Sequence, residues 1–158
     1  MRMAAPLEVG ICCRDLEQLL AFYTEVLGLT LVNTVEVPAE KAAAAHLSDG
    51  AYRVARLQTD RGERIKLLQP AAPPAELQPA SRILDRVGTA YLTFIVPDLR
   101  STLARLLQAG MAIDTGSEPV EVRDGTWLVF GRDPEGNVLE FVEYRDVVDY
   151  RPDLKERP

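Results

Sequence analysis

The chain is short of the residues from which most metal and redox sites are built, since its 158 residues include one histidine and two cysteines. With His46 alone, histidine-rich zinc sites and histidine-dependent catalytic triads lose most of their support. Cys12 and Cys13 are neighbours, and on a strand their side chains would point to opposite faces. We therefore interpret them as small apolar residues of a reduced protein rather than as a redox pair.

Long apolar runs and a surplus of positive charge are also missing. No run approaches the roughly 18 apolar residues that cross a bilayer, and residues 1–6 lack the apolar core of a signal peptide. We therefore expect a cytoplasmic protein without membrane contact. The formal net charge of −6 makes general nucleic-acid binding an unlikely function, because an acidic surface repels phosphate backbones.

An internal repeat divides the chain into two halves. Residues 8–27 (EVGICCRDLEQLLAFYTEVL) and 91–110 (YLTFIVPDLRSTLARLLQAG) each show an apolar run of strand length, then Asp-Leu, then a helical pattern that ends near Gly. Asp15 and Asp98 are good N-cap residues, and Gly28 and Gly110 suit the left-handed end of a helix. A repeat at this spacing predicts two copies of one structural unit.

Three strand-like segments follow each predicted helix. They span residues 29–37, 51–59 and 64–69 in the first half, and 111–114 (running irregularly on to 122), 126–130 and 138–144 in the second. We predict an α+β fold of two tandem βαβββ modules, 7–69 and 88–144, in one domain covering 1–158. A proline-rich linker, 70–87, joins the modules and a charged tail, 145–158, follows them. One helix covers one face of each mixed half-sheet, so we expect the opposite faces to enclose a cleft.

Several short motifs occur in both halves in the order and at the spacing of one known superfamily. They are Val9-Gly10-Ile11, Asp15-Leu16, Ala21-Phe22-Tyr23 and Val26-Leu27-Gly28-Leu29, then Phe94, Val96, Asp98-Leu99, Ala109-Gly110, Arg132-Asp133-Pro134-Glu135-Gly136-Asn137 and Leu139-Glu140-Phe141. Over residues 7 to 144 the chain resembles the vicinal oxygen chelate superfamily, which includes glyoxalase I, extradiol dioxygenases, methylmalonyl-CoA epimerase and bleomycin resistance proteins. The resemblance implies the fold strongly and the reaction weakly.

The resemblance also implies four metal-ligand positions, where the superfamily usually has His, Glu or Gln, His and Glu. In this chain they fall on Glu8, Lys66, Tyr91 and Glu140, and only Glu140 matches the pattern. A protonated lysine has no lone pair to donate, and like charges about 4 Å apart cost on the order of 4 kcal/mol at an effective dielectric near 20. We therefore expect no cofactor, disfavour a divalent metal, and interpret the four residues as a salt-bridged polar cluster.

Strand alternation supports a pocket-facing position for Lys66 and Glu140, because their chain neighbours are apolar. Exposed strand residues are the alternative for both. Arg56 and Thr93 are candidate substrate-binding residues, and Arg56 would suit an anionic group, although a surface arginine is the simpler interpretation. Tyr91 could be a half-buried aromatic at a strand start.

Two functions of different classes follow from these residues. The first is a metal-independent isomerase, epimerase or cyclase acting on an enolisable carbonyl, in which Lys66 supplies positive charge, Glu140 or Glu8 the base and Tyr91 a hydrogen-bond donor. We favour this enzyme because four buried ionisable side chains are costly to retain without a use. The alternatives are a binding protein of the antibiotic-resistance type and a metal-dependent glyoxalase-like lyase or dioxygenase. The partners we expect are a small molecule and a second copy of the chain.

Overall fold

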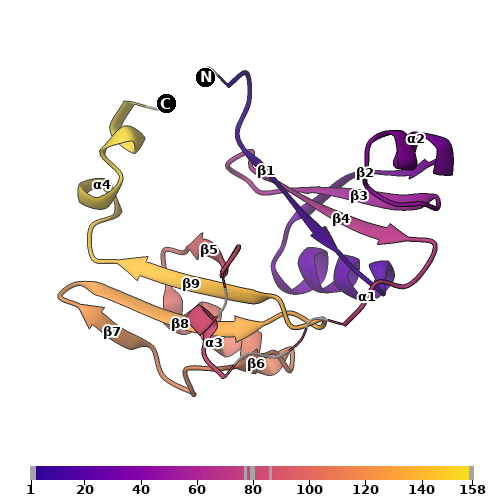
Figure 1. The fold of residues 1–158 in the computed structure, drawn as a ribbon. Helices are drawn as coiled ribbons and strands as arrows, with labels where there is room; N and C mark the ends of the chain where they lie inside the picture. Colours follow the sequence, from indigo (N-terminus) through magenta and orange to yellow (C-terminus); the bar gives the residue numbers. More distant parts are fainter. Residues whose placement is uncertain (1–2, 77, 79–80, 86, 157–158) are drawn as a thin grey trace. The chain divides into compact units, whose positions relative to one another are not determined.

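A computed structural model describes residues 3–76, 78, 81–85 and 87–156. By its internal contacts the chain divides into two compact units, Met1–Leu77 and Gln78–Pro158, here called the first and the second unit. Figure 1 shows that each unit has its own sheet and its own long helix. Positions 77, 79, 80 and 86 of the predicted linker lie outside the described residues.

The first unit is a four-stranded mixed sheet with two helices. Its elements are β1 (Glu8–Cys12), α1 (Leu16–Ala21) running into a π-helical turn (Phe22–Val26), β2 (Thr30–Val37), α2 (Ala39–Ala44), β3 (Tyr52–Gln58) and β4 (Arg64–Pro70). The strand order is β1-β4-β3-β2. β1 is parallel to β4, and the other two pairs are antiparallel.

Local chemistry explains why the chain turns from β1 into α1. Asp15 caps the helix, since its carboxylate accepts the backbone N–H of Gln18 at 3.0 Å. Helical spacing then places Leu16, Leu19 and Tyr23 on one side, and all three are fully buried. They belong to the core of this unit, with Ile11, Cys13, Ala55, Leu57, Ile65 and Leu67 from the sheet face that α1 covers.

The second unit repeats the pattern with one strand more. Its elements are β5 (Leu92–Ile95), α3 (Leu99–Gln108), β6 (Ala112–Ile113), β7 (Val120–Arg123), β8 (Thr126–Arg132), β9 (Val138–Tyr144) and α4 (Val147–Tyr150), with 3-10 turns at Ile83–Asp85 and Pro152–Glu156. The strand order is β5-β9-β8-β6, and β7 also pairs with β8. The irregular segment predicted from 111 to 122 is therefore two short strands, because Gly116, with a φ of 90°, turns the chain between them.

The N-terminus of α3 is capped in the same way as that of α1. The Asp98 carboxylate accepts the backbone N–H of Ser101 at 2.9 Å, and the Glu143 carboxylate accepts that of Leu99 at 2.7 Å. The core contains Leu99, Leu103 and Leu106 from α3, with Val129, Leu139 and Phe141 from β8 and β9. Odd-numbered residues of β9 thus face α3, which leaves Glu140 on the opposite face.

The predicted α+β fold of two repeated modules with mixed sheets is confirmed, and most strand limits agree with the sequence within two residues. The charged tail contains α4, which Asp146 caps by accepting the backbone N–H groups of Val148 and Asp149. Within the described residues, every helix is too short or too polar to span a membrane.

Candidate functional site

The first unit carries a polar row on the sheet face that α1 leaves uncovered. Because side chains alternate along a strand, Glu8, Lys66 and Arg56 lie on the face opposite the buried Ile65 and Leu67. Strand register makes Lys66 the cross-strand partner of Arg56 and of Gly10, and Arg64 the partner of Glu8. The predicted residues of this unit are therefore brought together on one face.

Glu8 is the acidic centre of this group. Its two carboxylate oxygens lie 3.4 Å from Nζ of Lys66 and 3.7 Å from Nη1 of Arg64. All three side chains keep about a third of their surface exposed: 35% for Glu8, 34% for Lys66 and 36% for Arg64. Pairs of this exposure contribute at most about 1 kcal/mol to stability. Their main effect is to fix charge at this place on the sheet.

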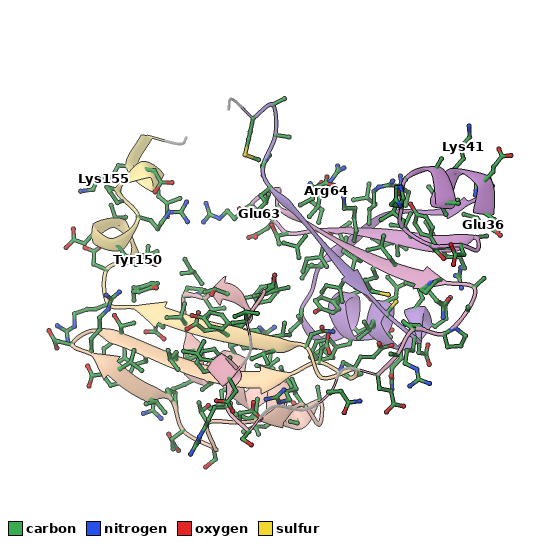
Figure 2. The ribbon with its side chains drawn as sticks, in the orientation of Figure 1. Glu36, Lys41, Glu63, Arg64, Tyr150 and Lys155 are labelled. Atoms are coloured by element: carbon green, nitrogen blue, oxygen red, sulfur yellow. The ribbon has the colours of Figure 1, made fainter. Side chains whose placement is uncertain are left out.

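Arg64 was missed by the reasoning from sequence. Arg64 starts β4 on the side of the sheet away from α1 (Figure 2), and its Nε donates to Oε1 of Gln58 at 2.8 Å. Arg56 donates through Nη1 to Oδ1 of Asn33 at 3.0 Å. The sequence alone could have identified Arg64, because it precedes Lys66 by two residues and therefore lies on the same face of the strand.

In the second unit, Glu140 and Thr93 form a direct pair. They are register partners on β9 and β5, and the Thr93 hydroxyl donates to Oε2 of Glu140 at 2.5 Å. A hydroxyl bond to a carboxylate of this length is in the range of charge-assisted hydrogen bonds. Thr93 therefore fixes the orientation of the Glu140 carboxylate, and the substrate-binding role predicted for it stays a prediction.

The strand partner of Glu140 belongs to a pair of aromatic residues. Phe130 is the β8 partner of Glu140, and the ring of Tyr91, just before β5, packs edge-on against Phe130 with centroids 5.1 Å apart. Tyr91 is 38% exposed, and its role as a hydrogen-bond donor stays a prediction.

Tyr144 extends the same face of β9. Its ring stacks on that of Tyr150 with centroids 3.9 Å apart, and the Arg123 guanidinium lies 5.9 Å from the Tyr144 ring centre. Burial raises the pKa of Tyr144 to about 12, helped by the Tyr150 hydroxyl and by the charge of Glu140. Tyr144 is therefore a neutral hydrogen-bonding group at physiological pH.

A surface cavity of about 300 Å³ lies beside this stack. It is lined by Arg123, Asp124, Gly125, Thr126, Tyr144, Arg145, Asp146, Asp149 and Tyr150. No residue predicted for the site lines it. The cavity holds both signs of charge, and Arg145 is already paired with Asp124 through two hydrogen bonds of 3.1 and 2.9 Å. We therefore do not place the functional site there.

The four residues at the superfamily's ligand positions fit a divalent metal poorly. The Lys66 ammonium offers no lone pair and lies beside Glu8, the one residue of its unit that supplies a carboxylate to the four. Tyr91 is an uncommon ligand outside iron sites. Among the residues that the structure describes, no group of three or more His, Cys, Asp and Glu side chains is placed to hold a metal ion.

Comparison with known proteins places this chain in a family. Residues 6–141 match the glyoxalase/bleomycin resistance protein/dioxygenase superfamily. The match covers well over half of the chain, so the protein belongs to this superfamily. A search of curated protein sequences gave no match.

Solved structures agree on the fold. A glyoxalase family protein from Bacillus cereus is 22% identical, with 92% of this chain and 97% of that chain covered and a TM-score of 0.76. The trypanothione-dependent glyoxalase I of Leishmania major is 20% identical, with 98% and 97% covered and a TM-score of 0.68. A glyoxalase/bleomycin resistance protein/dioxygenase domain from Frankia sp. is 21% identical, with 92% and 95% covered and a TM-score of 0.67. At these identities the likeness establishes the fold alone.

Proposed function

We propose that this protein is an enzyme that moves a proton on the carbon beside a carbonyl group, as an isomerase, epimerase or cyclase does, without a metal. The observation that carries the proposal is the 3.4 Å pair between Lys66 and Glu8. It puts an ammonium group where relatives in the superfamily usually have a metal ligand. A fixed positive charge can stabilise an oxyanion as a metal ion would.

The two carboxylates take different roles in this proposal. Glu8 lies between two cations, Lys66 and Arg64, so each of its carboxylate oxygens already faces a positively charged partner. Glu140 has the Thr93 hydroxyl as its neighbour instead. Our candidates are therefore Glu140 for the base and Lys66 for the oxyanion-stabilising charge, with Glu8 as the residue that positions Lys66. Tyr91 is the candidate hydrogen-bond donor.

The proposed step balances without a co-reactant. The Glu140 carboxylate takes a proton from the carbon next to the carbonyl, and the C–H electron pair forms the carbon–carbon double bond of an enolate. The carbonyl π electrons move to oxygen, where a positively charged side chain must compensate the negative charge. Return of the proton to the same or to a conjugated carbon gives the epimer or the isomer and restores Glu140.

Solvent deuterium exchange tests this proposal without knowledge of the physiological substrate. Small enolisable carbonyl compounds, among them methylglyoxal, 2-oxopentanoate and methylmalonate, are incubated with the protein in D2O, and their C–H signals are followed by proton NMR. We expect exchange above the buffer rate for at least one compound, and a loss of at least about 100-fold in Glu140→Gln and Lys66→Met. Full exchange in both variants excludes this mechanism.

A second candidate is a binding protein that sequesters a small molecule. The edge-on pair of Tyr91 and Phe130 favours it, because partly exposed aromatic surface suits a planar apolar ligand. Such a protein would bind one of the compounds and return it without exchange in D2O. That outcome, with unchanged affinity in Glu140→Gln, selects this function over the enzyme.

We also propose that the protein forms a homodimer. β2 is eight residues long and exposed along its length, with Leu31, Val32 and Val35 each at least 40% exposed. Among the described strands it pairs only with β3, and an unpaired apolar edge favours association with another strand. Light scattering coupled to size-exclusion chromatography tests this, and a monomer at micromolar concentration contradicts it.

A further inference from the structure

Three cations share the uncovered sheet face of the first unit. Arg56, Lys66 and Arg64 come from adjacent strands, with Arg56 and Lys66 as direct cross-strand partners and Arg64 two residues before Lys66. Cross-strand partners have Cβ atoms about 4.5–5.5 Å apart. The two side chains can therefore contact neighbouring atoms of one small ligand.

The cations outnumber the acid that faces them. Within the described part of the chain, the salt bridges of Lys66 and Arg64 are both with Glu8, and Arg56 is hydrogen-bonded to the neutral Asn33. The contacts to Glu8, 3.4 and 3.7 Å, are longer than the roughly 2.7–2.9 Å of a charge-assisted hydrogen bond. A chain with a net charge of −6 thus keeps a local excess of positive charge whose donors are incompletely used.

An apolar row lies next to these cations on the same face. This row lies two residues along each strand from the row that contains Arg56 and Lys66. Its members, aligned by cross-strand register, are Val35, Val54, Leu68 and Cys12. Val54 is only 2% exposed, so the part of this row that a ligand can reach is formed by Val35, Leu68 and Cys12. At Gly10, a β-carbon would lie 3.1 Å from Cδ1 of Leu68, so the missing side chain lets Leu68 lie close to β1. The face therefore offers charge for one end of a ligand and apolar surface for the rest.

We infer that the substrate is an enolisable oxo acid with an apolar body, whose carboxylate binds Arg56 and whose carbonyl oxygen lies at Lys66. This inference rests on the proposed function, because Lys66 there stabilises the enolate oxygen. The guanidinium of Arg56 matches a carboxylate with two parallel hydrogen bonds. Arg64 adds positive charge beside them and, with Lys66, holds Glu8. The apolar row takes the alkyl chain of the acid.

Isothermal calorimetry with three matched probes tests the inference: 2-oxopentanoate, pentanoate, which lacks the carbonyl, and 2-pentanone, which lacks the carboxylate. We expect 2-oxopentanoate to bind most tightly, and Arg56→Met to weaken it by about tenfold or more. Arg53→Met is the matched control. Arg53 lies on the same strand with its side chain on the α1 side, where it pairs with Glu17 at 2.7 Å, so its removal should leave binding unchanged.

The possible outcomes separate this inference from the proposed function. Equal affinity of Arg56→Met and the wild-type chain, no binding of 2-oxopentanoate by the wild type, or equal binding of 2-pentanone overturns the oxo-acid inference. Tighter binding of inorganic phosphate than of 2-oxopentanoate overturns the assignment of a carboxylate. An Arg56-dependent affinity without C–H exchange in D2O supports the acid site and contradicts the enzyme. If methylglyoxal exchanges its C–H protons and Arg56→Met does not change that exchange or the binding of 2-oxopentanoate, the enzyme is supported and the acid site is contradicted.

Discussion

The ammonium of Lys66 lies 3.4 Å from a carboxylate oxygen of Glu8, on neighbouring strands of one sheet. The resemblance of the sequence to its superfamily implies that both positions are ones that usually contribute to a metal site. Here they compensate each other's charge, and Arg64 adds a second cation 3.7 Å from the other oxygen. The chemistry that we propose rests on this ammonium group at a position where the resemblance implies a metal ligand.

The energy of this pair is measurable by a double-mutant cycle. Glu8→Gln and Lys66→Met, singly and together, should give a coupling free energy of about 0.2–1 kcal/mol in urea unfolding, because both side chains are about one-third exposed and screened by water. The coupling should fall in high salt. A coupling near zero at low salt would show that the two groups do not interact in solution.

Thr93 should act through Glu140 rather than on the substrate itself. Thr93→Val removes the hydroxyl that donates to Oε2 of Glu140 at 2.5 Å and keeps the side-chain shape. We expect the rate of C–H exchange to fall by about tenfold, with a shift of its pH profile, while the KM for 2-oxopentanoate stays unchanged. Thr93→Ser, which keeps the hydroxyl, should restore the rate. A change in KM alone would return Thr93 to a substrate-binding role.

Tyr144 should make the fold sensitive to strongly alkaline solution. Its pKa is raised to about 12 in the folded chain, chiefly by burial, against about 10 in an unfolded one. A raised pKa means that its stabilising contribution is complete below pH 10 and is lost as the pH rises toward 12. The melting temperature of Tyr144→Phe should therefore fall less between pH 10 and 12 than that of the wild type. Equal slopes would contradict the raised pKa.

The cap of α3 should make the stability of the fold depend on pH in the opposite direction, with a loss toward acid. Hydrogen bonds from Ser101 hold the pKa of Asp98 below its usual value. The stabilisation is then present above the unfolded pKa, near 3.9, and is lost as the pH falls through the folded one. Asp98→Asn should keep the cap yet remove this acid-side decline, whereas Asp98→Ala should lower the melting temperature at neutral pH too. Circular dichroism melts from pH 2 to 7 measure both effects.

A side chain at Gly131 should destabilise the second unit. A β-carbon there would lie 2.8 Å from the carbonyl oxygen of Ala112 and 2.9 Å from Cδ1 of Ile113, so β6 would have to move away from β8. We expect Gly131→Ala to lower the free energy of unfolding by about 1–3 kcal/mol. Gly10→Ala is the control, since it meets only the flexible end of Leu68 at 3.1 Å. Equal losses in urea unfolding would contradict this packing.

The fold was predictable because each repeat contains the residues that begin and end its helix. Asp15 and Asp98 cap the two helices as expected, and alternation placed Lys66 and Glu140 on the faces away from α1 and α3. The split of one expected strand into β6 and β7 was missed, because the sequence does not show where the ladder to β8 is interrupted.

The candidate site was predictable only in part. Alternation gives the face of a residue but not its cross-strand neighbours, which depend on register. Register is what places Arg64 beside Glu8 and Thr93 beside Glu140. The choice of Glu140 as the candidate base also needed the register. It depends on which of the two carboxylates has a cation next to it.

Elemental analysis of protein purified without a metal-affinity tag, after incubation with Mn, Fe, Ni and Zn salts and removal of the excess, tests whether Lys66 has replaced the metal. We predict far less than one metal ion per chain and a melting temperature that a chelator leaves unchanged. About one ion per chain, with a melting temperature that falls on chelation, would contradict the account and return the protein to the metal-dependent lyases and dioxygenases of its superfamily.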